Sequence, residues 1–301
     1  MLKTWFIALR PWSFTAAFIP VALGAAIAWN EGAFDPFLFV LTALGGIIMQ
    51  AGTNLINTYG DYISGVDTVE SAVTCPQLVT GVLRPRDMKL AGIGAFALAG
   101  LIGFYLAWLR GWPILAIGAV GTLGGYCYTA GWRPYKYLGL GSTFVFFLMG
   151  PLMVWPSYYI QTGHHSWLPV LVSLPVGFLV SAILHANDLR DMTEDRRTGI
   201  STLALGIGFK RSILLYFALY IGAYGCLGLL VILGLIPWTA ALPVILLPLA
   251  VRMFSLTRQA AAGCRDKMIM LERLTAGFHF QFGLLFVLGL AVYPFLRGWL
   301  A

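Results

Sequence analysis

The chain has 301 residues, of which 59% are hydrophobic and only 10% are charged, and its formal net charge is +7. Soluble domains carry about 25% charged residues, so this composition excludes an ordinary soluble domain and predicts a single integral membrane domain, residues 1–301, whose exterior faces lipid. The positive charge, which would suggest a nucleic-acid partner in a soluble protein, is better explained by membrane topology, and we expect no nucleic-acid partner.

Nine segments are long and apolar enough to span a bilayer, which takes about 20 mainly apolar residues. In chain order they are residues 13–30, 36–58, 89–109, 112–131, 139–160, 167–186, 211–234, 237–254 and 274–296. Pro151, Pro156 and Pro175 fall inside predicted spans and should kink them, which is tolerated where neighbouring helices or water satisfy the freed backbone groups. We therefore predict an all-α bundle of nine transmembrane helices. The largest segments predicted to be non-helical are residues 59–88, 187–210 and 255–273.

The charged residues are unevenly divided between the two membrane faces. With nine spans, 17 of the 19 Lys and Arg residues fall on one side, and only Arg110 and Arg297 fall on the other. By the positive-inside rule, the face with 17 basic residues is cytoplasmic and carries the N-terminus. All but two of the 12 acidic residues lie on the same face. The sequence therefore predicts a multi-pass protein of the cell inner (plasma) membrane with its site facing the cytoplasm.

A first polar motif runs from Asn54 to Asp67, at the end of the second predicted span. Asn57 and Asp61 are four residues apart, so they share one face of a continuing helix. Asp67 would lie on a different face of that helix. The Ser64-Gly65 pair offers a place for the helix to end and for the chain to turn Asp67 back.

A second polar motif lies at the end of the sixth predicted span. Asn187, Asp191 and Asp195 recur every four residues, which gives a stripe of one amide and two carboxylates on a helix. A single charged residue just past a helix end is usually part of a solvated loop, but polar groups at the ends of apolar spans tend to face the bundle interior. Two motifs with the same Asn-x-x-x-Asp core on one membrane face favour a shared site.

These residue types fit a magnesium and phosphate site. Mg²⁺ takes oxygen ligands, typically one or two carboxylates with substrate phosphates and waters, and two facing Asp-bearing stripes leave room between them for a diphosphate. Basic side chains that could bind phosphate oxygens lie nearby: Lys136, Arg190, Arg196, Arg197 and Lys210. The four cysteines are scattered, with no CxxC or Cys/His cluster, which argues against zinc and against a disulfide framework.

At these residues the sequence resembles the UbiA superfamily of membrane aromatic prenyltransferases. Within it, the sequence is most similar to the 1,4-dihydroxy-2-naphthoate prenyltransferases (MenA) and the vertebrate menaquinone-4 synthase. Besides the two Asp motifs, the similarity covers Leu9-Arg-Pro-Trp-Ser-Phe14, Tyr128-Thr-Ala-Gly131 with Tyr135-Lys136-Tyr137, Gly150-Pro151 before Tyr159-Ile-Gln161, and Gly199-Ile-Ser-Thr-Leu-Ala-Leu205. It extends in the expected order over roughly residues 5–215.

The resemblance implies a nine-helix bundle around a central cavity that the Asp motifs cap from the cytoplasm. The Mg²⁺ ligands that it implies are Asn57, Asp61, Asp67, Asn187, Asp191 and Asp195. The diphosphate contacts expected from it are Lys136, Arg190, Asn54, Asn57 and Asn187, and the residues expected to be catalytic are Asp61, Asp191 and Lys136. The isoprenoid would run into an apolar cleft that opens to lipid.

Two stretches depart from the family pattern. Relatives often carry charged residues, including an arginine, in the stretch that here reads Ala72-Val-Thr-Cys75-Pro-Gln77-Leu-Val. They also commonly have an acidic residue near Ser142. Both departures bear on the acceptor pocket and on diphosphate binding.

The function that this resemblance implies is Mg²⁺-dependent transfer of a polyprenyl group from a prenyl diphosphate to an aromatic acceptor in the bilayer. The forms of the two motifs favour 1,4-dihydroxy-2-naphthoate, with loss of CO₂, as in menaquinone biosynthesis. Some aromatic side chains could stabilise an allylic cation through their π faces: Trp12, Phe14, Tyr126, Tyr128 and Tyr158. Aromatic residues in spans more often serve in packing. Alternatives are another aromatic acceptor (4-hydroxybenzoate or homogentisate, or one of the haem or chlorophyll type) and, from another class, a membrane cation transporter. A CDP-alcohol phosphotransferase is disfavoured because its Asp-Gly-x-x-Ala-Arg signature is absent.

Overall fold

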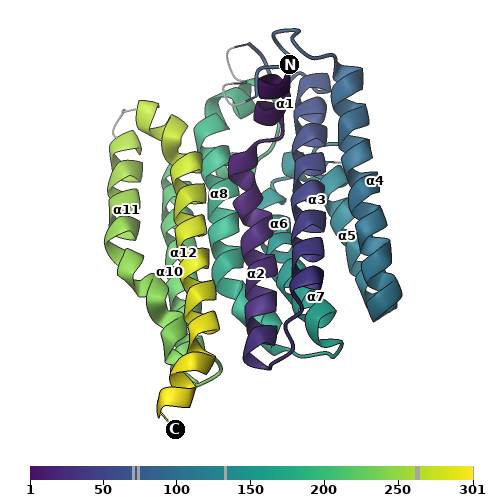
Figure 1. Cartoon of the computed structure of the whole chain (residues 1–301). Helices are drawn as coiled ribbons and strands as arrows, with labels where there is room; N and C mark the ends of the chain where they lie inside the picture. Colours follow the sequence, from purple (N-terminus) through teal and green to yellow (C-terminus); the bar gives the residue numbers. More distant parts are fainter. Residues whose placement is uncertain (70–71, 73–74, 132–133, 262–264, 301) are drawn as a thin grey trace.

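The fold is a bundle of long helices that run along one common direction (Figure 1). The computed structural model describes residues 1–69, 72, 75–131, 134–261 and 265–300. In chain order the elements are α1 (Leu2–Ala8), η1 (Pro11–Phe14), α2 (Thr15–Asn30), α3 (Pro36–Ile63), α4 (Pro85–Arg110), α5 (Trp112–Cys127), η2 (Tyr135–Tyr137), α6 (Gly141–Met149), α7 (Pro151–Thr162), α8 (Leu168–Thr198), α9 (Leu203–Ile207), α10 (Phe209–Ile232), η3 (Trp238–Leu246), α11 (Leu247–Ala261) and α12 (Arg265–Leu300). Across these ranges the structure contains no β-strand, only an isolated bridge between Leu138 and Ser201.

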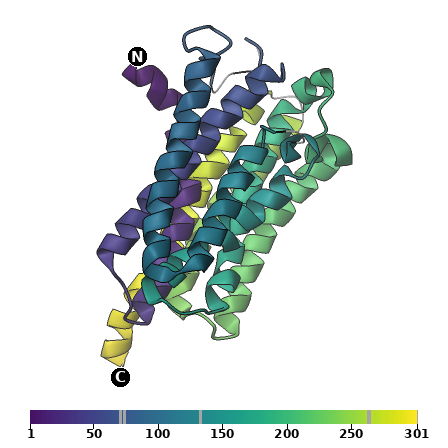
Figure 2. The same ribbon diagram turned by 90° about the vertical axis from the view of Figure 1, so that its right-hand side faces the viewer.

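The prediction of a multi-pass, all-α membrane protein is confirmed. Eight helical segments of the described chain are long and apolar enough to cross a bilayer. They coincide with eight of the nine predicted spans. The remaining predicted span, residues 112–131, corresponds to α5, which has only 16 residues and is therefore about 24 Å long. The count of nine spans stays a prediction. The two termini lie at opposite ends of the bundle in both views (Figures 1 and 2).

Two of the three segments predicted to be non-helical are mostly helical. Helix α8 continues through the second motif to Thr198 and ends where Gly199 takes a left-handed conformation, with φ +73°. The motif contains three Arg residues with Leu189, Met192 and Glu194, which favour helix, and it has no Gly or Pro before Gly199, so its charge did not end the helix. The predicted loop at residues 255–273 is occupied by the end of α11 and the start of α12, and residues 262–264 lie outside the described part. The predicted loop at residues 59–88 is confirmed in its central part, between α3 and α4.

The predicted span at residues 139–160 is broken into two helices, α6 and α7. Gly150 separates them, and Pro151 takes the first position of α7, where its missing N–H is harmless. A side chain at Gly150 would lie only 3.2 Å from the Cα atom of Gly177 in α8, so the break lets the backbone approach α8 closely. Pro156 and Pro175 lie inside α7 and α8 without ending them.

The bundle has a densely packed half and a hollow half. The largest buried cluster joins α2, α7, α8, α10 and α12, and its largest fully buried side chains include Tyr216, Tyr220, Phe278, Phe282 and Phe286. On the other side, α3, α4, α5, α6 and α7 surround a cavity with their apolar side chains and glycines. The end of the bundle that carries the N-terminus also carries the C-terminal ends of α3 and α8, which bear the two polar motifs (Figure 1).

Candidate active site

The end of α3 folds back as the sequence predicts. Gly65 adopts a left-handed conformation with φ +70°. The backbone N–H of Val66 donates to the carbonyl oxygen of Asp61 at 2.9 Å, and that of Gly65 to Tyr62 at 3.1 Å, the pattern of a Schellman turn. This turn returns Asp67 to the neighbourhood of Asp61. Burial, assisted by the charge of Asp61, raises the pKa of Asp67 to about 6.

The two motifs converge on one small polar pocket with a volume of about 40 Å³. The residues that line it are Arg10, Asn57, Asp61, Val66, Asp67, Ala72, Cys75, Lys136, Asn187, Arg190, Asp191, Glu194 and Asp195. All six predicted metal ligands are in this set, together with Lys136 and Arg190. Side chains from α3, α8, η2 and the N-terminal segment therefore share a single pocket.

Asp61 is held from two sides. Its Oδ2 atom lies 2.7 Å from the Nζ atom of Lys136, and its Oδ1 atom accepts a hydrogen bond of 2.7 Å from the hydroxyl of Tyr137. Burial alone would lower the pKa of Lys136, but the contact with Asp61 raises it above its usual value, and Lys136 is therefore protonated. This contact depends on Gly60, since a side chain there would lie 2.5 Å from the backbone oxygen of Thr129, in the segment that leads to Lys136.

Arg190 links the second motif to the C-terminal helix. Its Nε and Nη2 atoms donate to the two carboxylate oxygens of Asp191, each at 2.7 Å, and Nη2 also donates to Asn187 Oδ1 at 3.2 Å. Its Nη1 atom forms an ion pair with Glu272 of α12. Sequence reasoning did not single out Glu272. The one indication in the sequence was that this carboxylate lies two residues before a predicted apolar span.

Arg10 is a second site residue that the sequence analysis did not single out. It is the only non-glycine residue of the described chain with a positive φ, 52°, a conformation that costs free energy and is common at functional sites. One of its terminal nitrogens donates to Thr58 Oγ1 at 3.1 Å, whereas its Nε atom is buried and has no hydrogen-bond partner in the part of the chain that the structure describes. Arg10 belongs to the Leu9–Phe14 stretch that carries the family similarity, and this similarity was the feature of the sequence that could have identified it.

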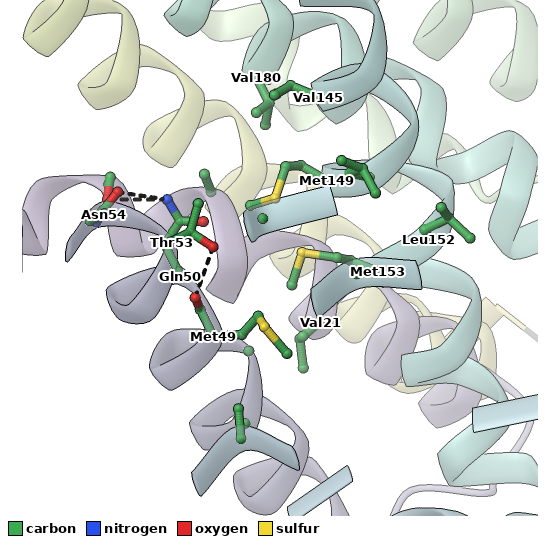
Figure 3. Close-up of a pocket in the computed structure, with 18 of the residues that line it drawn as sticks. Val21, Met49, Gln50, Thr53, Asn54, Val145, Met149, Leu152, Met153 and Val180 are labelled. Atoms are coloured by element: carbon green, nitrogen blue, oxygen red, sulfur yellow. Dashed lines mark hydrogen bonds between the residues drawn. The ribbon is translucent and has the colours of Figure 1, made fainter. Parts of the chain in front are cut away.

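A larger apolar cavity of about 310 Å³ continues from the polar pocket into the bundle. The two share Arg10, Asn57 and Asn187. Figure 3 shows its interior, where Met49 and Val21 lie across from Met149 and Met153. Its walls are mostly aliphatic side chains, methionines and glycines, which suit a long hydrocarbon chain.

The aromatic candidates divide between the cavity and other places. Trp12 and Tyr128 line the cavity, whereas Phe14 and Tyr126 are not among the residues that line it. The hydroxyl of Tyr158 donates to Glu31 at 2.7 Å and contacts His164 at 2.8 Å. These partners lie in loops at the opposite end of the bundle. Tyr158 was therefore a wrong candidate for contact with the reacting carbon.

Asn54 lies in the apolar cavity rather than in the polar pocket. Its amide nitrogen donates to the Leu9 carbonyl and to Ser13 Oγ, both at 2.8 Å. Its oxygen accepts from Gln50 at 3.3 Å, and these two side chains are labelled in Figure 3. These bonds use its polar atoms to hold the segment around η1 against α3. The structure thus separates Asn54 from the other predicted diphosphate contacts.

The two departures from the family pattern occupy buried positions. Cys75 lines the polar pocket, and its Sγ atom accepts a hydrogen bond of 3.4 Å from Thr58. Gln77 and Ser142 are also buried, and their side-chain oxygens have no hydrogen-bond partner among the described residues. Val73 and Thr74, in the same stretch as Cys75, lie outside the described residues.

The donor set of the polar pocket fits Mg²⁺ bound together with a phosphate ligand. In the described part of the chain, no three His, Cys, Asp or Glu side chains are grouped closely enough to hold an ion by themselves. Mg²⁺ does not require such a cage, because it usually binds one or two carboxylates and completes its shell with phosphates and waters. Within the described part of the chain, the buried Asn57 Oδ1 atom has no hydrogen-bond partner. Asn57 lines the pocket together with four Asp residues, so oxygen ligands are available there.

Comparison with known proteins identifies the family of the chain. Residues 17–276 match the sequence profile of the UbiA prenyltransferase family. The chain is 35% identical over 292 residues to UbiA prenyltransferase domain-containing protein 1 of Homo sapiens, covering 96% of this chain and 83% of that protein. It is 34% identical over 230 residues to 1,4-dihydroxy-2-naphthoate octaprenyltransferase of Bacillus subtilis (strain 168), covering 76% of this chain and 74% of that protein.

Solved structures share the fold. A UbiA homolog from Archaeoglobus fulgidus bound to GPP and Mg²⁺ superposes with a TM-score of 0.62 at 16% identity, covering 94% of this chain and 99% of that chain. The apo structure of a UbiA homolog from Aeropyrum pernix K1 superposes with a TM-score of 0.66 at 15% identity, covering 93% and 98%.

Proposed function

The chain belongs to the UbiA prenyltransferase family and is a multi-pass membrane prenyltransferase, and we propose that it transfers a polyprenyl group from a prenyl diphosphate to 1,4-dihydroxy-2-naphthoate in the synthesis of menaquinone. The observation that carries the proposal is the union of a charged pocket with an apolar cavity. The polar pocket suits a diphosphate, and the cavity of about 310 Å³ that opens from it suits the attached hydrocarbon. A cation transporter would not need this pairing, and family membership excludes that alternative.

In the proposed reaction, six side chains of the polar pocket would hold Mg²⁺ together with the diphosphate: Asn57, Asp61, Asp67, Asn187, Asp191 and Asp195. Bound there, Mg²⁺ neutralises charge on the departing phosphate oxygens. Support for its use here comes from the donor set and from the homolog of Archaeoglobus fulgidus, which was solved with GPP and Mg²⁺. Asn54 contributes indirectly, because its hydrogen bonds to Leu9 and Ser13 hold the segment next to Arg10.

Lys136 and Arg190 bind the diphosphate as cations. Lys136 is protonated and lies beside Asp61 with its side chain 13% exposed, so it is positioned to bind an oxygen of the leaving group as negative charge develops there. Arg190 presents a planar fork of donors that matches phosphate geometry. Preorganised donors of this kind stabilise the transition state without reorganising during the reaction.

The proposed chemistry conserves atoms and charge. The allylic C–O bond breaks, and its electron pair leaves with the diphosphate. The electron-rich ring of the acceptor forms a C–C bond to the allylic carbon, and the ring carboxylate then leaves as CO₂, returning its bonding pair to the ring. Trp12 and Tyr128 line the cavity and offer π faces to the allylic cation. The apolar walls limit the access of water that would otherwise trap the cation.

We further propose that the polar pocket faces the cytoplasm of a cell that carries this protein in its inner (plasma) membrane. The support is the distribution of 17 of 19 basic residues on the face that bears the motifs. A reporter fused to the N-terminus should be accessible only from the cytoplasm. Accessibility from the outside would overturn the orientation.

A product assay tests the proposed function. Membranes that contain the protein are incubated with Mg²⁺, prenyl diphosphates of several lengths, and one of three aromatic acids: 1,4-dihydroxy-2-naphthoate, 4-hydroxybenzoate or homogentisate. We expect a prenylated naphthoquinol by mass spectrometry, with release of CO₂ from carboxyl-labelled acceptor. The matched control is Asp191→Asn. Transfer to 4-hydroxybenzoate or homogentisate alone would replace the acceptor, and no transfer to any of the three would contradict the proposal.

A further inference from the structure

The ion pair between Arg190 and Glu272 lies at the boundary between the polar pocket and the apolar cavity. Arg190 lines the pocket from α8, and Glu272, which follows it by 82 residues, lines the cavity from α12. Their side chains are only 13% and 12% exposed. The chemistry proposed above assigns a role to Arg190 but none to Glu272.

The partners of Arg190 give this pair a consequence for metal binding. Its guanidinium contacts both carboxylate oxygens of Asp191 at 2.7 Å. Two parallel hydrogen bonds of this kind form one of the strongest polar contacts in proteins. Asp191 is also a proposed Mg²⁺ ligand, so the guanidinium and the metal compete for the same oxygens.

Glu272 offers the guanidinium a second carboxylate on its other side. Its Oε2 atom pairs with Nη1, the one nitrogen that neither Asp191 nor Asn187 contacts. A buried ion pair contributes little stability compared with apolar side chains of the same volume. Ionisable residues that face the interior of a membrane bundle usually serve a function. The pair therefore calls for a functional explanation.

We propose that Glu272 is a positioning residue. It holds Arg190 at the boundary when the metal, bound with the diphosphate, replaces the guanidinium on Asp191. The inference rests on the proposed function, because it assumes that Asp191 binds the metal. With Glu272 present, the positive charge of Arg190 is shared between two carboxylates, and Asp191 can be released at little cost. Without it, Asp191 is the one carboxylate that the described residues place on the guanidinium, and the metal must displace a tighter partner.

The test measures Mn²⁺ binding in the presence of inorganic pyrophosphate by electron paramagnetic resonance on the purified full chain in detergent. We expect Glu272→Gln, which keeps an oxygen for Arg190 but removes the charge, to weaken Mn²⁺ binding by about ten-fold, within the range of coupling between contacting residues. Glu272→Asp should restore most of the affinity. Asp87→Asn is the matched control, because Asp87 is an exposed carboxylate in the first turn of α4, and it should leave the affinity unchanged.

A second comparison, made in the Arg190→Met protein, tests whether Glu272 acts by positioning Arg190 or by attracting the metal directly with its own charge. In Arg190→Met protein, Glu272 has no guanidinium to hold, so adding Glu272→Gln should change Mn²⁺ affinity by less than about two-fold. An equal ten-fold loss in both backgrounds would overturn the inference in favour of direct attraction. The unfolding midpoint of each variant, measured in the same detergent, identifies any variant that fails to fold.

The outcomes for the wild-type protein distinguish the two proposals. If wild-type protein binds Mn²⁺ with pyrophosphate and Glu272→Gln binds it equally well, the inference fails and the proposed function stands. If wild-type protein binds neither Mn²⁺ nor pyrophosphate, the proposed function fails and the inference fails with it.

Discussion

The Nζ atom of Lys136 lies 2.7 Å from the Oδ2 atom of Asp61, although 75 residues separate them in the chain. The Asp61 side chain is only 6% exposed, so the lysine neutralises a carboxylate that is almost shut off from water. The same ammonium group is the proposed partner of the diphosphate. One contact therefore serves both the folded structure and the reaction.

Replacing Lys136 with Met should separate these two roles. We expect Lys136→Met to reduce kcat by about 10²–10³-fold, the usual effect of removing one transition-state donor. It should also destabilise the protein by about 3–5 kcal/mol, because Asp61 is left buried without its partner. Adding Asp61→Asn should recover most of the stability but none of the activity. Steady-state kinetics and thermal unfolding in detergent measure both effects, and full activity of Lys136→Met would remove the lysine from the mechanism.

Asp191→Asn tests the second motif. The amide keeps the size of the side chain but removes the charge that would bind Mg²⁺. We expect turnover to fall by at least about 100-fold, a loss in transition-state stabilisation of roughly 2.7 kcal/mol, at every Mg²⁺ concentration. The protein should still fold, because Arg190 keeps its pair with Glu272. Turnover that recovers fully at high Mg²⁺ would show that Asp191 affects metal affinity alone.

Gly60→Ala tests the close approach that brings Asp61 to Lys136. The added methyl would lie 2.5 Å from the Thr129 backbone oxygen, and such overpacking typically costs about 1–3 kcal/mol. We expect a lower unfolding temperature together with a higher KM for the prenyl diphosphate. The control is Gly94→Ala on α4, where a methyl meets no atom within 4 Å. That change should stabilise the helix slightly, and equal effects of the two substitutions would contradict this account.

Gly121→Leu tests the cavity as the isoprenoid site. Gly121 lies on α5 and lines the cavity, and a side chain there meets no atom within 4 Å, so leucine should project into free space without disturbing the fold. We expect kcat/KM for long prenyl diphosphates to fall by more than about ten-fold, because each buried CH₂ contributes about 0.8 kcal/mol. Short donors should be little affected.

The control for the cavity is Gly100→Leu on α4. Gly100 is exposed, also has no atom within 4 Å, and is not among the residues that line the cavity. Its substitution should leave the donor series unchanged. A Gly121→Leu protein that uses long and short donors as the wild type does would place the hydrocarbon elsewhere.

The sequence predicted the helical spans and the two motifs because both depend on local patterns. Apolar runs located eight spans, and the four-residue spacing of Asn187, Asp191 and Asp195 correctly indicated one stripe. Gly65 indicated the turn that brings Asp67 back. The contacts of Glu272 and Arg10 were missed because they join segments that are distant in the chain. No periodicity shows which residues of α12 or of the N-terminal segment face α8.

Asn54 and Tyr158 show a related difficulty. Each has a polar group at the end of an apolar stretch, which is typical of site residues and of structural hydrogen bonds alike. The structure distinguishes them by their partners: Asn54 bonds Leu9 and Ser13, and Tyr158 bonds Glu31. The length of α5 was also overestimated, because the residues after Cys127 are apolar enough to extend a span but do not continue the helix.

The positions of helix α5 and of the polar pocket have a consequence for where the two reaction products lie. Gly118 on this helix is exposed and also lines the cavity, whereas the polar pocket lies at the end where α3 and α8 stop. In the proposed reaction the prenylated product would therefore lie in the cavity and the diphosphate in the polar pocket, so the two products would occupy different parts of the site.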